Sequence, residues 1–355
     1  MVDPLDLIER YGADALRFTL AALTMPGSDL KLSEARKEGY RHFVNKIWNA
    51  SRFALMNLDG SVRIDQEIDE KEVVSLPDRW IIRELNQTIR KVYQSLEGYK
   101  FNEASHALYQ FVWHQFCDWY LELIKPFLYQ EEDVGRKKVT QQTLLHTLDR
   151  TFRMLHPFMP FVTEEIWQQL PNQRKDGSIM ITPFPKPDSR FDAPEVTEEM
   201  GWVIEIITAL RNIRGEMNVP PGDQVIVLVR TKEMEVEKGI EKNQSFIKNL
   251  ARVKELTVGR NIEKPLYSAF AAVRGTEIFV PMDRSRMEEE GKRLQKEIIK
   301  IEKEMAFVTQ KLSNDQFLSK APPGVVEEVR GKAKEMQALR DKLEESLKKI
   351  KEVLD

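Results

Sequence analysis

The segment Tyr40–Phe53, with the sequence YRHFVNKIWNASRF, combines aromatic rings with arginine, lysine and asparagine side chains. It contains no glycine or proline, so it predicts a helix. Unpaired bases stack on aromatic rings, cations bind phosphates, and amides hydrogen-bond to base edges. These residue types on one helix therefore favour contact with single-stranded RNA.

A helix with about 3.6 residues per turn separates these side chains into two faces. The face expected to be core consists of Tyr40, Phe43, Val44, Ile47, Trp48, Ala54, Leu55 and Leu58. The opposite face carries Arg41, Asn45, Asn49 and Arg52. Phe53 falls between Lys46 and Asn49, which makes it a candidate platform for a stacked base. The alternative is that Phe53 packs beneath a neighbouring helix or loop.

The residues before this segment predict one more helix. Asp3 is a capping residue followed by proline at the first helical position. An apolar stripe then consists of Leu5, Ile8, Leu16, Leu20 and Leu23. Pro26–Gly27 is predicted to end this helix, and Ser33 with Glu34 to begin the next.

The residues after it predict further helices near 70–97, 101–130 and 137–170. Pro157 and Pro160 should break the last of these, and Thr163 can cap a fresh turn. Five prolines between residues 171 and 194 predict a linker or a wrapping loop.

Beyond residue 194 the pattern changes. A helix over 195–217 and a turn at Pro220–Asp223 precede the β-branched run QVIVLVRT, which predicts a strand over 224–231. A helix near 233–251 and the strands ELTVG and AAVRGTEIFVP follow, with Arg274–Thr276 as a hairpin turn. These elements make a small α/β domain.

The last segment carries two runs of apolar residues at heptad spacing, joined by Ala321–Gly324. Such a pattern predicts an antiparallel coiled-coil hairpin, with Gly291 and Arg340 as weak points in its seam. Acidic residues flank the seam on the first helix and basic residues flank it on the second, which predicts ion pairs between the two helices. The first helix keeps a basic outer stripe of Lys292, Arg293, Lys296, Lys300 and Lys303.

We therefore expect a mainly α protein with three domains: a helical bundle with a Pro-rich C-terminal linker over 1–194, a small α/β domain over 195–283, and a coiled-coil arm over 284–355. The chain has 355 residues, a net charge of −3 and a single cysteine, Cys117. One cysteine excludes an internal disulfide and a cysteine-based zinc cluster. No run is apolar enough to span a membrane and no signal peptide is evident, so we expect a cytoplasmic protein.

Longer stretches resemble the valyl-tRNA synthetase family. They are YGADALRFTLAALTMPGSDLKLSEARKEGYRHFVNKIWNASRF, FNEASHALYQFVWHQFCDWYLELIKP, HPFMPFVTEEIWQQL and NDQFLSKAPPGVVEEVR. The resemblance covers the whole chain and implies a helical anticodon-binding domain followed by a tRNA-binding arm. The family's HIGH and KMSKS motifs, nucleotide-binding sheet and editing domain are missing. The resemblance therefore implies the C-terminal half of the enzyme, without catalytic residues, metal or cofactor of its own.

The resemblance also assigns roles to residues. It implies that Phe53 stacks on an anticodon base, with Arg52, Asn49, Lys46, Asn45, Arg41 and Arg36 as companions. It implies that the arm contacts the tRNA corner through Lys292, Arg293, Lys296, Lys300, Lys303, Lys311, Lys320 and Arg330. Arg17 can contact RNA or pack the first helix onto the second. The implied partners are valine tRNA and the N-terminal catalytic and editing domains, which use ATP with magnesium; we expect a monomer.

Other interpretations remain open. The hairpin can be a protein-docking coiled coil, the chain can be an enzyme of another kind, or it can be the corresponding half of the isoleucyl or leucyl enzyme. His114, Cys117 and Asp118 lie within one helical turn, but no orienting or oxyanion group accompanies them, so we favour a packed helix there. The remaining histidines show no metal-ligand spacing.

Overall fold

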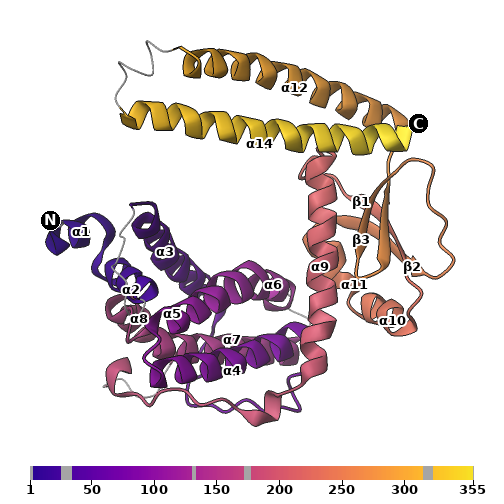
Figure 1. Ribbon diagram of the computed structural model, residues 1–355. Helices are drawn as coiled ribbons and strands as arrows, with labels where there is room; N and C mark the ends of the chain where they lie inside the picture. The colour runs from indigo at the N-terminus through magenta and orange to yellow at the C-terminus, as the bar shows by residue number, and fades with distance from the viewer. Residues whose placement is uncertain (1–2, 25–33, 130–132, 172–176, 315–322, 355) are drawn as a thin grey trace. The chain divides into compact units, whose positions relative to one another are not determined.

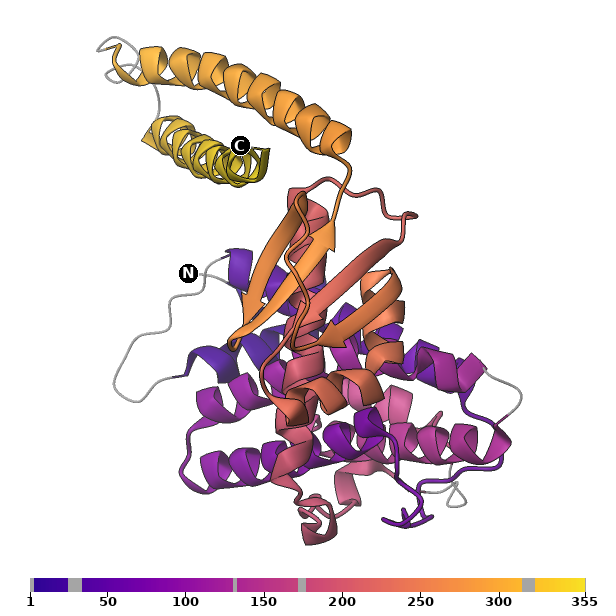
Figure 2. The ribbon, with the colours of Figure 1, turned by 90° about the vertical axis from the view of Figure 1, so that its right-hand side faces the viewer.

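A computed structural model describes residues 3–24, 34–129, 133–171, 177–314 and 323–354, without the side chains of 34–37 and 323. The chain forms two compact units, Met1–Gly201 and Trp202–Asp355, which we describe separately (Figures 1 and 2). We call them the helical unit and the second unit. The division into three domains at residues 194 and 283 stays a prediction.

The helical unit begins with α1 (Pro4–Tyr11) and α2 (Ala13–Leu23), where the sequence predicts one helix. Asp3 caps α1 as expected, since its carboxylate accepts a hydrogen bond from the Leu5 amide at 2.8 Å. Gly12 has a φ of 89°, which no side-chain-bearing residue adopts easily and which ends α1. The predicted apolar stripe is wrong in part, because this break leaves Leu5 72% exposed while Leu16 is buried. The predicted end at Pro26–Gly27 lies outside the described residues.

The other α- and π-helices of this unit lie where the sequence predicts helix, except that α4 begins at Leu76 and not near residue 70. They are α3 (Glu34–Asn57), α4 (Leu76–Glu97), α5 (Phe101–Tyr109), the π-helix η1 (Gln110–Tyr120), α6 (Leu121–Tyr129), α7 (Val134–Leu155) and α8 (Pro160–Trp167). Short 3-10 turns η2 (Ile179–Ile181) and η3 (Ser189–Phe191) follow, and α9 (Pro194–Glu216) begins here. The helices α5, η1 and α6 are continuous, as the prediction of a single helix over 101–130 requires. The sequence does not predict their π-helical middle.

The break between α7 and α8 falls at the predicted prolines, but Thr163 does not cap α8. The helix starts at Pro160, and Asp14 of α2 accepts hydrogen bonds from its Phe161 and Val162 amides at 3.2 and 2.7 Å. Arg17 donates to the carbonyls of Pro157 and Phe158 at 3.0 and 3.3 Å. Asp14 and Arg17 therefore satisfy backbone groups that the break leaves free.

The second unit contains a four-stranded sheet in the order β2–β1–β4–β3. The strands are β1 (Val225–Arg230), β2 (Val253–Gly259), β3 (Ser268–Val273) and β4 (Thr276–Pro281). β1 and β2 are parallel, the other pairs are antiparallel, and α9 lies behind the sheet in Figure 2. Arg274 and Gly275 both have positive φ, as a tight hairpin turn requires, which confirms the predicted turn. The predicted helix over 233–251 is two helices, α10 (Met234–Lys242) and α11 (Gln244–Ala251).

The arm consists of α12 (Arg284–Leu312) and α14 (Pro323–Leu354), which lie side by side (Figures 1 and 2). Ile301, Val308 and Met336 are buried between them, so the predicted hairpin seam is confirmed. The predicted ion pairs between the helices are wrong for the described part of the arm. There Arg284 and Arg293 of α12 pair with glutamates of α12 itself, because residues three or four positions apart on one helix lie close together.

Candidate nucleic-acid interface

The outer face of α3 presents the polar side chains that the sequence predicts. Arg41, Asn45, Asn49 and Arg52 are all exposed. Phe43, Ile47, Ala50 and Ala54 form the buried face. The prediction that Trp48 belongs to the core is wrong, since it is 44% exposed. The buried face is centred away from Trp48, whose ring therefore joins the exposed polar face.

One edge of α3 runs alongside the continuous helix α5–η1–α6. The Tyr40 and Tyr109 rings are 6.1 Å apart, Lys46 Nζ lies 2.8 Å from Asp118 Oδ1, and Lys125 Nζ lies 5.7 Å from the Phe53 ring centre. These contacts follow one another in the same order along both helices. The two helices are thus parallel neighbours over the whole predicted RNA-binding segment.

The π-helix explains how these contacts stay in register. From Tyr40 to Phe53 the chain advances 13 residues, whereas from Tyr109 to Lys125 it advances 16. A π-helix closes its hydrogen bonds from i to i+5, so it is wider and rises less per residue than an α-helix. Eleven π-helical residues, Gln110–Tyr120, compress the longer segment enough to match α3.

Lys46 is already engaged by two side chains of η1. It forms the ion pair with Asp118 and lies 5.2 Å from the Trp113 ring centre. Its side chain and that of Asp118 are 35% and 36% exposed. Burial lowers the pKa of Lys46, but the hydrogen bond and charge of Asp118 outweigh it and raise the pKa above the ordinary value. Lys46 therefore stays protonated and accessible from solvent.

Phe53 is half-buried. Its ring is therefore neither fully exposed, as a platform for a stacked base would be, nor fully covered by a neighbouring helix. Lys125 of α6 lies against its face, and Lys125 Nζ also forms a 2.6 Å ion pair with Glu122. The sequence does not predict Lys125 or Glu122 as site residues. The i, i+3 spacing of Glu122 and Lys125 could have suggested their pairing, but nothing local places either beside Phe53. We name Lys46, Phe53, Trp113, Asp118, Glu122 and Lys125 the α3–η1 edge.

Other predicted site residues lie apart from this edge or outside the described part of the chain. The Arg36 side chain and Lys320 are outside it. Arg17 contacts backbone carbonyls of the α7–α8 connection, which is a structural role different from the predicted packing onto the second helix. Arg36 and Lys320 stay predictions as RNA contacts.

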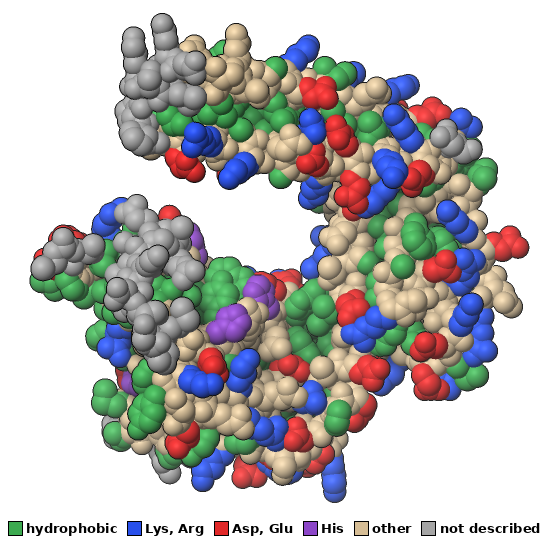
Figure 3. All heavy atoms as spheres, in the orientation of Figure 1, with side chains coloured by type: hydrophobic (Ala, Val, Ile, Leu, Met, Phe, Trp, Pro, Cys, Tyr) green, Lys and Arg blue, Asp and Glu red, His purple; other side chains and the backbone are tan. Residues whose placement is uncertain are grey.

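The arm presents Lys292, Lys296, Lys300, Lys303 and Lys311 as exposed side chains. Arg293 instead forms ion pairs of 2.6 and 2.7 Å with Glu290 and Glu297 of its own helix, and Arg330 lies 3.7 Å from Glu327. Lys311 Nζ lies 4.6 Å from the ring centre of Phe307, itself 59% exposed. Figure 3 shows basic and acidic side chains interspersed along the visible face of the arm.

Comparisons with known proteins agree with this arrangement. The profile described as the anticodon-binding domain of tRNA ligase matches residues 78–229, and the valyl tRNA synthetase tRNA binding arm matches residues 287–351. Valine–tRNA ligases of Oceanobacillus iheyensis and Geobacter sulfurreducens are 42% and 43% identical over 351 and 355 residues. Each alignment covers 99% of this chain.

The chain belongs to the valine–tRNA ligase family. It spans about two fifths of the length of these relatives, 39% and 40% respectively, and matches their C-terminal part. A crystal structure of a LeuRS–tRNA–LeuAMS ternary complex from Agrobacterium radiobacter K84 is 23% identical over 54% of this chain and 22% of that one, with a TM-score of 0.41. That likeness is too weak to support an argument.

Only part of the α3–η1 edge lies within the residues that match the anticodon-binding domain. The anticodon-binding profile begins inside α4, so Lys46 and Phe53 precede it, whereas Asp118, Glu122 and Lys125 lie within it. The five predicted lysines of the arm between 292 and 311 all lie within the arm profile.

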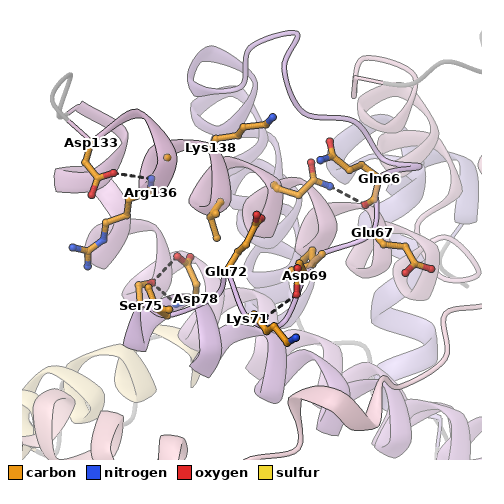
Figure 4. Close-up of a pocket in the computed structure, with 15 residues that line it drawn as sticks. Gln66, Glu67, Asp69, Lys71, Glu72, Ser75, Asp78, Asp133, Arg136 and Lys138 are labelled. Atoms are coloured by element: carbon orange, nitrogen blue, oxygen red, sulfur yellow. Dashed lines mark hydrogen bonds between the residues drawn. The ribbon is translucent and has the colours of Figure 1, made fainter.

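A polar pocket of about 670 Å³ lies elsewhere in the helical unit, between the start of α4, the start of α7 and residues 66–74 (Figure 4). At its wall Asp78 is buried and accepts hydrogen bonds from Ser75, Tyr120 and Thr140 at 2.5, 2.8 and 2.9 Å. Burial raises the pKa of Asp78. Five carboxylates and three cations line the pocket. The Asp78 hydrogen bonds join α4, η1 and α7, which is a structural role.

The spacing of His114, Cys117 and Asp118 does not produce a nucleophile. Cys117 is buried, and burial raises the pKa of its thiol to about 12, so it is not a nucleophile at neutral pH. His114 and Asp118 are partly exposed, with their side chains 3.3 Å apart. The helix that carries them is packed, as predicted, through its buried Phe111, Phe116 and Tyr120. Among the described residues no group of three His, Cys, Asp or Glu side chains suits a metal ion. No described helix is long and apolar enough to cross a membrane.

Proposed function

We propose that this chain is the tRNA-binding part of a valine–tRNA ligase, an enzyme that attaches valine to its tRNA using ATP. The observation that carries the proposal is the presence, in one chain, of sequence matches to an anticodon-binding domain and to a tRNA-binding arm. The exposed cations and aromatic rings on both regions supply the chemistry that RNA requires.

The helical unit takes the anticodon. Phe53 stacks on an anticodon base, and the exposed polar face of α3 contacts the surrounding nucleotides through Arg41, Asn45, Asn49 and Arg52. Lys46 and Lys125 meet phosphates at the edge of the same surface. Their positions beside aromatic rings support this role, because a single strand offers a base and a phosphate together.

The arm binds the corner of the tRNA. Its exposed lysines, Lys292, Lys296, Lys300, Lys303 and Lys311, lie along α12 and suit a phosphate backbone without reading bases. Together the two regions hold the tRNA so that its acceptor end reaches the catalytic domain of the full-length enzyme.

The full-length protein supplies the chemistry. Its N-terminal catalytic and editing domains use ATP with magnesium, and this chain contributes no catalytic residue or cofactor site. We propose that it acts as a monomer in the cytoplasm.

The test is binding of this chain to a valine tRNA transcript, to the same transcript with an altered anticodon, and to an unrelated tRNA, at two salt concentrations. We expect binding that weakens with salt and with the altered anticodon. Salt-sensitive binding that ignores the anticodon would restrict the function to the arm. Absence of binding to every tRNA would overturn the proposal, and salt-resistant binding to a protein would favour a docking coiled coil.

A further inference from the structure

The α3–η1 edge contains two similar groups, each made of a lysine, a carboxylate and an aromatic ring. Lys46 pairs with Asp118 at 2.8 Å and lies 5.2 Å from the Trp113 ring centre. Lys125 pairs with Glu122 at 2.6 Å and lies 5.7 Å from the Phe53 ring centre. Both carboxylates project from the continuous helix, about one turn apart, so the two groups follow each other along the edge.

The carboxylates oppose what the lysines would otherwise do. A lysine on an open surface attracts any phosphate backbone, including duplex RNA. A carboxylate within ion-pair distance cancels that charge and repels an approaching phosphate. Neither pair is buried, since all four side chains are between 35% and 41% exposed, so neither pair is needed to satisfy an interior charge.

The aromatic rings of the edge offer a stacking surface, which only unpaired bases can use. In a duplex the bases are stacked on each other and cannot reach a protein ring, whereas an unpaired base can stack on one. Asp118 and Glu122 can also accept hydrogen bonds from the amino groups of an unpaired base. A single strand therefore gains contacts that offset the repulsion, and a duplex does not.

We propose that Asp118 and Glu122 determine specificity by rejecting RNA that offers only phosphates, so that the α3–η1 edge selects single-stranded loops. This inference rests on the proposed function, because it assumes that RNA binds at this edge. The device is a repulsive element against wrong partners rather than an added attraction for the right one.

The experiment compares Asp118→Asn, Glu122→Gln and the double variant with the unmodified chain. Each is titrated with a valine tRNA transcript and with an RNA duplex of the same number of phosphates. Since an exposed pair is worth at most about 1 kcal/mol, each substitution should tighten duplex binding by up to about fivefold. Binding to valine tRNA should change less, so the preference for tRNA over duplex should fall.

Two control variants test whether the charge at these positions, and not the net charge of the chain, sets the preference. Asp118→Glu keeps the charge and should keep the preference. Glu165→Gln removes one exposed carboxylate from α8. It changes the net charge as much as Asp118→Asn does and should leave the preference unchanged.

The outcomes separate this inference from the proposed function. An unmodified chain that binds neither RNA would overturn both. An unmodified chain that prefers tRNA, with variants whose preference is unchanged, would overturn only the rejecting role. Variants that bind tRNA more weakly without binding the duplex more tightly would mean that Asp118 and Glu122 only attract the tRNA and do not repel duplex RNA, which also overturns the rejecting role.

Discussion

The α3–η1 edge and the arm both present lysines to solvent, but the surroundings of those lysines differ. Lys46 is neutralised by Asp118, 72 residues away in sequence, and lies against the Trp113 ring of the same π-helix as Asp118. On α12 the lysines Lys292, Lys296, Lys300 and Lys303 are exposed, and none of them forms an ion pair with another described residue. The first surface is assembled by tertiary packing and the second by a helical repeat.

This difference suggests two kinds of binding. A surface whose charges are balanced and whose rings are half-covered discriminates between ligands, because only some ligands compensate for the displaced contacts. A surface of free lysines binds any backbone of suitable shape and depends strongly on salt. Substitutions in each region, followed by stability and binding measurements, can test whether the two regions differ in this way.

The largest expected effect comes from the ring cluster that holds the α3–η1 edge together. Phe43 is fully buried and its ring centre lies 5.2 Å from Phe18 and 4.8 Å from Tyr109. Phe43→Ala should lower the free energy of unfolding by about 3–5 kcal/mol. Chemical denaturation measures this, and anticodon discrimination should disappear while salt-dependent binding through the arm remains.

Phe43→Leu serves as the matched control, since it keeps most of the apolar volume and should retain discrimination. A Phe43→Ala variant that is less stable but still distinguishes the altered anticodon would contradict this prediction. Anticodon discrimination would then not depend on the packing of the Phe43 ring.

A smaller effect is expected from Phe53 itself. Phe53→Ala should weaken binding of valine tRNA by about 1–3 kcal/mol, the usual contribution of one stacked base. The altered-anticodon transcript should be affected less. Titrations with both transcripts check this, and equal weakening for both would mean that the ring does not stack on the anticodon.

Substitutions in the arm should change the salt dependence of binding and should affect the two transcripts equally. When Lys292, Lys296, Lys300 and Lys303 are replaced together with alanine, the slope of log affinity against log salt should become shallower. The expected decrease is up to about 0.9 for each phosphate that the arm no longer neutralises. Titrations of both transcripts at several salt concentrations measure this, and affinity should decrease alike for the two. A decrease confined to one transcript would contradict a backbone-binding arm.

Acid should affect the helical unit through His146, whereas residues 284–355 contain no histidine. Burial, followed by the charge of Arg150, holds the pKa of His146 well below its ordinary value of 6.5. The unfolded chain then binds a proton that the native chain does not, so stability present above about pH 6.5 is lost as pH falls toward the native pKa. The free energy of unfolding should decrease by up to about 1.4 kcal/mol per pH unit there.

His146→Gln is the comparison for this measurement. It removes the titrating group and keeps an acceptor for the Arg150 hydrogen bond of 2.8 Å. Denaturation between about pH 7 and pH 5 should show a flatter dependence for this variant, and an unchanged dependence would exclude His146 as the cause.

Substitutions of two glycines should change stability with opposite signs. Gly12→Ala should destabilise the helical unit by about 1–3 kcal/mol, because its φ of 89° strains any residue with a Cβ. Gly291→Ala should stabilise the arm by about 0.5–1 kcal/mol, since a Cβ there would meet Ile350 and Leu347 at ordinary contact distances of 3.6 and 3.9 Å. Thermal unfolding of both variants checks this, and equal signs would contradict it.

Local signals predicted much of the fold. Asp3–Pro4 at the start of α1, the β-branched run of β1, the turn at Arg274–Gly275 and the heptads of the arm all lie where the sequence places them. Each of these depends on neighbours within a few residues, so a single stretch of sequence contains the whole physical cause. The exposed polar face of α3 was predictable for the same reason, since helical periodicity alone separates it from the core.

The sequence by itself therefore determined most of the elements, the hairpin seam and the polar side chains of α3. Only the tertiary structure decided that Asp14 caps α8, that Trp48 is exposed, and that Asp118 and Lys125 complete the α3–η1 edge. These outcomes depend on which distant groups packing brings within a few ångströms, and neither periodicity nor residue spacing contains that information.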